Sequence, residues 1–212
     1  MFKDRVHAGR LLAERLREYK SKPTIILAIP RGGVIVGDEI AKAIGARLEV
    51  IVPRKLGAPG NPELAIGAIA EDGSIYLSED IANQLDVDNN YLKDESKAQL
   101  EEIKRRVSVY RRGKDLPNLE GKSVLLVDDG LATGATMKAA VKMVKKMNPK
   151  EVIVAIPVAP PDTVEDIKKM VDDVVCISKP TFFFAIGQFY EDFEQVSDEE
   201  VLSILSNYQK SS

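Results

Sequence analysis

The chain has 212 residues, 44% hydrophobic and 30% charged, which is the balance of a folded globular protein with one sizeable core. Its formal charge of −3 provides no broad basic field, which disfavours nucleic acid as a partner. A single cysteine, Cys176, excludes an intrachain disulfide, and a single histidine, His7, excludes a metal centre built from several histidines. No apolar run approaches the ~18 residues of a membrane span, and the charged first residues do not resemble a signal segment. We therefore expect a protein of the reducing cytoplasm that makes no membrane contact.

In the first half of the chain, apolar runs alternate with helical patterns, which predicts a parallel α/β sheet. The expected elements are a helix at 7–20, a strand at 24–29, a helix at 34–44 and a strand at 48–52. Residues 53–62 are rich in Gly and Pro, and we expect a loop there. Short strands at 64–70 and 75–77 flank an Asp-Gly turn signal, so a hairpin should project from the core.

The second half continues the alternation after a long polar helix. The expected elements are that helix at 90–112, a strand at 123–128, a helix at 135–147, and strands at 151–157 and 173–178. Further helices should begin at Asp162 and Ser197, because each has an acid three residues later. The charges of the long helix, Arg105 and Arg106 among them, are interpreted as a solvated face. We find no repeat and no linker, which predicts a single domain over residues 1–212.

The most informative stretch of the chain is 124–136, where an apolar strand ends in the adjacent acids Asp128 and Asp129. A short loop with Thr133, Gly134 and Thr136 follows, and then a helix begins. N–H and hydroxyl groups at a helix N-terminus bind phosphate, whereas carboxylates accept hydrogen bonds from a sugar diol. A turn that only caps a helix would not need two acids followed directly by a loop of small and hydroxyl residues. The stretch is neither a Walker loop nor a dinucleotide fingerprint, and it suits a sugar phosphate.

Two other loops should lie at the same edge of the sheet, since ligands collect beyond the carboxyl ends of parallel strands. Arg31-Gly32-Gly33 follows the strand at 24–29, and its glycines let N–H groups turn toward an anion, although a plain strand-to-helix turn would use glycine equally well. Arg54-Lys55 follows the strand at 48–52 and either presents two cations to the ligand or forms an exposed basic turn.

Residues 124–136 resemble the phosphoribosyl-diphosphate signature of type I phosphoribosyltransferases, and the likeness covers most of 24–178. It implies the fold of that family: a core at about 22–178, a projecting hairpin lid, and a small hood formed by about 179–212 with or without the N-terminal segment. The substrate-binding residues that it implies are Arg31, Gly32 and Gly33 at the diphosphate, Asp128 and Asp129 at the ribose diol, and Gly130, Leu131, Ala132, Thr133, Gly134, Ala135 and Thr136 at the 5′-phosphate.

The resemblance also implies the reaction, in which a nitrogen acceptor displaces diphosphate from phosphoribosyl diphosphate through an oxocarbenium-like transition state. Arg54, Lys55 and Asp129 would be the catalytic residues, with the two cations carried on a mobile arm. Mg²⁺ would be the cofactor, held mainly by the substrate, with no direct protein ligand and with Asp128 and Asp129 at most bound through water. In this family the Arg31 loop often contains an unusual peptide bond, and the active protein is a homodimer.

The acceptor stays open. Ala132 stands where enzymes for 6-oxopurines carry an acid, and residues 131–134 resemble adenine and uracil enzymes more closely. The aromatic run at 181–190 could stack on a base or could simply close the core. The best likeness is to small bacterial and archaeal phosphoribosyltransferases of unassigned acceptor. A regulator that senses phosphoribosyl diphosphate without catalysis is the main alternative, and a hydrolase or ribose-phosphate kinase lacks any adenine-nucleotide motif.

Overall fold

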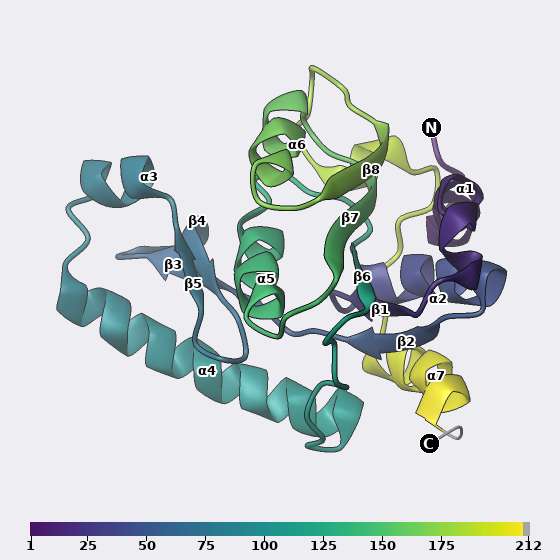
Figure 1. Ribbon diagram of the computed structural model, residues 1–212. Coiled ribbons are helices and arrows are strands. Elements are labelled where there is room, and N and C mark those ends of the chain that lie inside the picture. The colour runs from purple at the N-terminus through teal and green to yellow at the C-terminus, as the bar shows by residue number, and fades with distance from the viewer. Residues whose placement is uncertain (210–212) are drawn as a thin grey trace.

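The computed structural model describes residues 1–209, which form two sheets and the helices around them (Figure 1). The central sheet has five parallel strands in the order β2-β1-β6-β7-β8. These strands are β1 (Thr24–Ala28), β2 (Arg47–Val50), β6 (Ser123–Val127), β7 (Glu151–Val158) and β8 (Asp173–Ser178). The sequence predicts each of them to within two residues at either end, so the parallel α/β sheet is confirmed.

Helices cover both faces of the central sheet (Figure 1). One face carries α1 (Arg5–Arg15) and α2 (Gly32–Ile44), and the other carries α5 (Ala135–Lys145) and α6 (Pro161–Lys168). Alternate side chains of β1 enter the two cores, with Ile26 on the α2 side and Leu27 on the α5 side. Burial on both faces explains why the strand reads as one continuous apolar run. No helix among residues 1–209 has the length and apolar character that a bilayer crossing requires.

The helix expected at 7–20 is wrong in its extent. It begins earlier, because Asp4 caps α1 by accepting a hydrogen bond from the His7 N–H at 2.7 Å. It also ends earlier, at Arg15, and a 3₁₀ turn, η1 (Arg17–Ser21), follows and leaves Tyr19 buried against the core. The His7 imidazole has a local structural role at this helix start, because its Nδ1 accepts from the Lys3 N–H at 3.1 Å.

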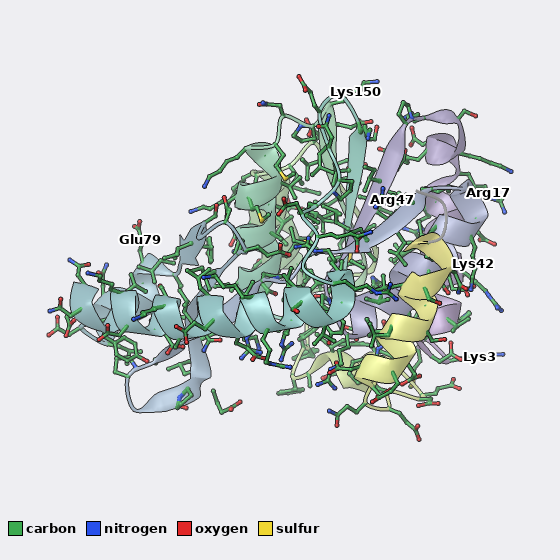
Figure 2. The ribbon with its side chains drawn as sticks, turned by 90° about the horizontal axis from the view of Figure 1, so that it is seen from below. Lys3, Arg17, Lys42, Arg47, Glu79 and Lys150 are labelled. Carbon is green, nitrogen blue, oxygen red and sulfur yellow. The ribbon has the colours of Figure 1, made fainter. Side chains whose placement is uncertain are left out.

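A second sheet and two helices form the arm, which projects from the central sheet (Figure 1). The arm consists of β3 (Arg54–Ala58), β4 (Asn61–Ile69), β5 (Ile75–Leu77), α3 (Glu79–Gln84) and α4 (Asn89–Arg111). The sheet is antiparallel in the order β3-β4-β5. The hairpin predicted from the Asp-Gly signal is confirmed as β4 and β5, and the long polar helix is confirmed as α4. Figure 2 shows Glu79 at the outer end of the arm and Lys42 on the opposite side of the molecule.

The loop expected at 53–62 is wrong, since this segment is β3, a turn, and the start of β4. The turn uses Gly60, whose φ of +72° suits glycine. At Gly57 the strands lie so close that a Cβ would come within 2.8 Å of the Pro62 Cα. The Gly and Pro residues therefore serve a tight, irregular hairpin, and pairing with β4 overrides their weak local preference for a strand.

The C-terminal part of the described chain contains η2 (Ile186–Phe189) and α7 (Asp198–Gln209), and α7 packs against α2 and β2. The cap predicted at Ser197 is present, because its Oγ accepts from the Glu200 N–H at 3.2 Å and its N–H donates to Glu200 Oε2 at 2.9 Å. The cap expected at Asp162 is wrong: Pro160 occupies that position, and Pro161 begins α6. Residues 210–212 of the expected hood lie outside the described residues.

Candidate active site

The three loops singled out in the sequence meet at the carboxyl edge of the central sheet. A Cβ on Gly33 would lie 2.9 Å from the Asp128 Cα, and one on Gly32 would lie 1.8 Å from Asp129 Oδ2. The loop after β1 therefore packs directly on the acids after β6, which only glycine permits. Lys55 of the third loop lines the same cavity as residues 128–136.

That cavity, which we call the loop cavity, has a volume of about 150 Å³, and Ile186 lines it as well. Gly134 precedes α5 with a φ of +70°, and Thr133 Oγ1 accepts from the Ala135 N–H at 3.4 Å. The N–H groups of Ala132, Thr133, Gly134, Thr136 and Met137 have no hydrogen-bond acceptor in the part of the chain that the structure describes. An open helix N-terminus of this kind attracts an anion.

The two adjacent acids have different surroundings, as expected for neighbours in an extended chain. Asp128 Oδ1 accepts from the Asp129 N–H at 2.8 Å, whereas Asp129 Oδ2 accepts from Arg5 Nε at 2.7 Å. Burial raises the pKa of both carboxyl groups, and the charge of Asp129 raises that of Asp128 further. Arg5 opposes this effect on the pKa of each acid. The two adjacent acids therefore differ in their partners, and Arg5 favours the ionised form of both.

Arg5 is a site residue that sequence reasoning missed. Its guanidinium lies 3.8 Å from the centre of the Phe193 ring, and its Nη1 donates to the Glu194 carbonyl at 2.8 Å. Tyr190 adds a second link from the same segment, because its hydroxyl donates to the Asp129 carbonyl at 2.6 Å. A bridge between Phe2 and Tyr190 attaches the start of the chain to this segment. Nothing local in the sequence marks a contact between residues so far apart.

The structure places Arg31 beside the site but gives its side chain other partners. Arg31 Nη1 donates to the Val196 carbonyl at 2.9 Å, and its Nε lies 3.2 Å from Asp198 Oδ1. The Pro30–Arg31 peptide bond is cis. Arg31 also lines a second cavity of about 430 Å³, together with Arg5, Gly32 and Arg106; we call it the arginine cavity.

Arg54 and Lys55 stand at the root of the arm, where β3 begins. Arg54 Nε donates to Gln99 Oε1 of α4 at 2.9 Å. Both cations line a third cavity of about 450 Å³, which we call the arm cavity and which also reaches Asp128 and Thr136. Because Lys55, Asp128 and Thr136 line the loop cavity as well, the arm cavity adjoins it.

The aromatic run at 181–190 does not form a strand. Phe182 and Phe184 are 80% and 89% exposed, whereas Phe183 packs on Phe189 with ring centres 5.1 Å apart. The residue of this segment that reaches the loop cavity is Ile186, an aliphatic side chain.

Within residues 1–209, no group of three or more His, Cys, Asp or Glu side chains is arranged to hold a metal ion. The carboxylates of Asp128, which lines the loop and arm cavities, and of Asp129, which lines the loop cavity, are nevertheless hard oxygen donors. Such a donor set fits Mg²⁺ only when bound phosphates and water supply the remaining ligands.

Comparison with known proteins agrees with this geometry. The family model for the phosphoribosyl transferase domain matches residues 5–194. A Mycobacterium tuberculosis protein named as a putative phosphoribosyl transferase is 44% identical over 205 residues, which is 97% of this chain and 46% of the relative. This chain thus spans about half the length of the curated relatives that it matches.

Two solved structures show the same fold. The crystal structure of TT1426 from Thermus thermophilus has a TM-score of 0.82 at 44% identity, over 98% of this chain and 99% of that one. The purine phosphoribosyltransferase from Pyrococcus horikoshii has a TM-score of 0.50 at 20% identity, over 93% of this chain and 97% of that one, and supports the fold alone. With its parallel sheet, projecting arm and loop at 128–136, the chain belongs to the phosphoribosyltransferase family and has the type I fold.

Proposed function

We propose that the protein transfers ribose 5-phosphate from phosphoribosyl diphosphate to a nitrogen of a nucleobase, with release of diphosphate. The observation that supports this most directly is the loop cavity, where an open helix N-terminus lies beside the buried Asp129, the half-buried Asp128 and a lysine. A phosphate monoester matches the helix N-terminus, and a vicinal diol matches the carboxylates. Both groups belong to one ligand, a ribose 5-phosphate unit.

The roles that we propose follow from these positions. The N–H groups and hydroxyls of residues 130–136 hold the 5′-phosphate, and Asp128 and Asp129 hold the ribose hydroxyls. Lys55 lines both the loop cavity and the arm cavity, so we place it and Arg54 on the leaving diphosphate. Gly32 and Gly33 let the Arg31 loop pack on Asp129 and Asp128, and we place this loop at the same group. Arg31 would join them by exchanging its contact with Asp198 for the diphosphate.

Catalysis on this proposal is electrostatic, because diphosphate leaves readily only when its charge is neutralised. Each ~1.4 kcal/mol by which the cations favour the transition state over the ground state gives a tenfold gain in rate. Bound Mg²⁺, held by diphosphate, ribose and water oxygens, would supply further positive charge at the leaving group. If the arm and Ile186 closed over the bound substrate, they would exclude water and protect the cationic sugar from hydrolysis. We further propose a role in nucleobase salvage in the cytoplasm.

The test is a panel of acceptors. The protein is incubated with phosphoribosyl diphosphate, Mg²⁺ and each common purine, pyrimidine or related base, and diphosphate release is measured. We expect release with one acceptor class, and Ala132 favours adenine or uracil over 6-oxopurines. Omission of Mg²⁺ should abolish the signal. Tight binding of phosphoribosyl diphosphate without product from any acceptor would contradict the transferase and support a sensor.

A further inference from the structure

The long helix α4 presents a polar stripe to the arm. Tyr91 Oη donates to the Gly57 carbonyl at 2.8 Å, and Glu95 Oε1 accepts from the Gly57 N–H at 3.1 Å. One turn later, Gln99 accepts from Arg54 Nε. Residues spaced by four lie on one side of a helix, so this face follows β3 from its far end back to its root.

Arg106 extends this stripe beyond the root of β3, where the helix faces cavities. Its Nε donates to Glu102 Oε1 at 2.8 Å, and its two terminal nitrogens have no hydrogen-bond acceptor among residues 1–209. The side chain is 22% exposed. Arg106 lines both the arginine cavity and the arm cavity and so connects them.

Arg106 lies close to a cation of the proposed site. Burial lowers the pKa of Arg54, and the positive charge of Arg106 lowers it further, although Glu102 and Glu95 partly offset this. Two guanidinium groups that repel each other at one cavity are stabilised by an anion between them. Arg105 contrasts with Arg106, since it shares Glu102 but is 59% exposed and lines neither cavity.

We propose that Arg106 binds the leaving diphosphate, so that the long helix, and not only the arm strand and the Arg31 loop, supplies the diphosphate site. This rests on the proposed function and extends it to a residue outside the three loops. The free edge of a guanidinium donates two parallel hydrogen bonds to phosphate oxygens, and a second arginine beside it favours a diphosphate over a monoester. The arm cavity adjoins the loop cavity through Asp128 and Thr136, which puts this anion next to the 5′-phosphate.

The test compares Arg106→Gln with the matched control Arg105→Gln, using calorimetric titration with magnesium diphosphate and, separately, with ribose 5-phosphate. For Arg106→Gln we expect at least about tenfold weaker diphosphate binding and unchanged ribose 5-phosphate binding, as for loss of one charge-assisted contact. Arg106→Lys should restore part of the affinity. Arg105→Gln should bind both ligands as the unaltered protein does, and Glu102 keeps one arginine partner in either variant.

Unchanged diphosphate affinity in Arg106→Gln would overturn the proposal. An equal loss of affinity for diphosphate and for ribose 5-phosphate would overturn it too, and so would an equal loss of diphosphate affinity in Arg105→Gln. If the unaltered protein bound neither ligand, the proposed function itself would fail. If the unaltered protein bound both ligands and Arg106→Gln bound diphosphate equally well, the proposed transferase function would remain supported and the role of Arg106 would be refuted.

Discussion

Asp129 is fixed at its side chain and at its backbone by residues from the two ends of the chain. Arg5 pairs with its carboxylate and Tyr190 with its carbonyl, and both partners are buried or nearly so. The contact with the Arg5 guanidinium favours the ionised form of a group that burial would otherwise protonate. Arg5 therefore opposes the protonation of Asp129, and on the proposed function it favours the form that accepts hydrogen bonds from ribose.

We expect Arg5→Gln to make activity more sensitive to acid. Burial already raises the pKa of the Asp128–Asp129 pair, and removal of Arg5 raises it further. As the pH is lowered, the pair then loses its charge at a higher pH. The acid limb of the pH profile of kcat/KM for phosphoribosyl diphosphate should therefore move to higher pH by about one pH unit or more. One pH unit corresponds to ~1.4 kcal/mol. Tyr190 and Lys55 also face this pair and stay unchanged.

Arg10→Gln is the matched control for that measurement. Arg10 is in the same helix and pairs with Glu39, but its side chain is 69% exposed. Its pH profile should match that of the unaltered protein. An Arg5→Gln profile that is merely lower at every pH would show a structural role for Arg5 and no effect on ionisation.

Lys55→Ala should lower kcat by about 100-fold, the usual cost of removing one group that stabilises developing charge. Lys55 is assigned to the leaving group, so the affinity for ribose 5-phosphate should change much less. Steady-state kinetics and ribose 5-phosphate titration check the two quantities separately. An equal loss in kcat and in affinity for ribose 5-phosphate would place Lys55 on the 5′-phosphate, which its position in the loop cavity also allows.

At the level of elements, a buried ion pair joins the arm to the central sheet. Glu71, in the turn after β4, accepts hydrogen bonds from the Val52 N–H at 2.8 Å and from Arg111 at the end of α4. Burial raises the pKa of Glu71 in spite of Arg111, so this carboxylate depends on its partners. Val52 directly precedes Pro53, Arg54 and Lys55, so the pair fixes the point from which the arm leaves the sheet.

We expect Arg111→Met to reduce the free energy of unfolding by about 3–5 kcal/mol, because it leaves the Glu71 charge buried without its cation. The double variant Glu71→Gln/Arg111→Met should recover much of that loss. Urea denaturation of the unaltered protein, the single variant and the double variant measures the free energy of unfolding of each. Arg112→Met is the control, since Arg112 is exposed, and it should stay within about 0.5 kcal/mol. A loss in the double variant equal to that of the single variant would refute the argument.

The sequence predicts those elements whose signals are local. Strands of the central sheet are buried on both faces and appear as apolar runs, and α7 carries a complete capping box. β3 cannot be predicted in this way, because Arg54–Ala58 becomes a strand only through its pairing with β4. The same limit applies to the site. The loop at 128–136 is a contiguous motif, whereas Arg5 and Arg106 reach it through the packing of distant helices.

The whole molecule consists of a sheet core with a projecting arm, and three cavities lie in the region where they meet. Three elements, α1, β3 and α4, and the loop that carries Arg31 contribute arginines or lysines to these cavities, which are also lined by the acids Glu63, Glu95, Asp128, Asp129 and Glu194. Cations from separate parts of the fold are therefore brought together at these cavities, beside acids, although the chain as a whole is slightly acidic.

Ribose 5-phosphate should stabilise the whole protein against heat. Ligand at 100 times its Kd adds ~2.7 kcal/mol to the free energy of unfolding, which corresponds to a rise of roughly 5–10 °C in Tm for a chain of this size. Differential scanning calorimetry measures the shift. Ribose without the phosphate should give almost none, and an equal shift with ribose would contradict phosphate recognition at the loop cavity.

We also expect a homodimer, as the family resemblance implies. Light scattering of the protein with phosphoribosyl diphosphate and Mg²⁺ checks this, and a mass equal to the 23.3 kDa of one chain would refute it.

The bridge between Phe2 and Tyr190 has a consequence for synthesis on the ribosome. The first residues emerge long before their partner at position 190, and most of the sheet can collapse in the interval. Arg5 then reaches its final place only when the segment from Tyr190 to Glu194 has left the exit tunnel. A nascent chain halted before that point would carry most of the α/β layer with an incomplete site, so we expect it to bind ligand only after residues 190–194 have emerged.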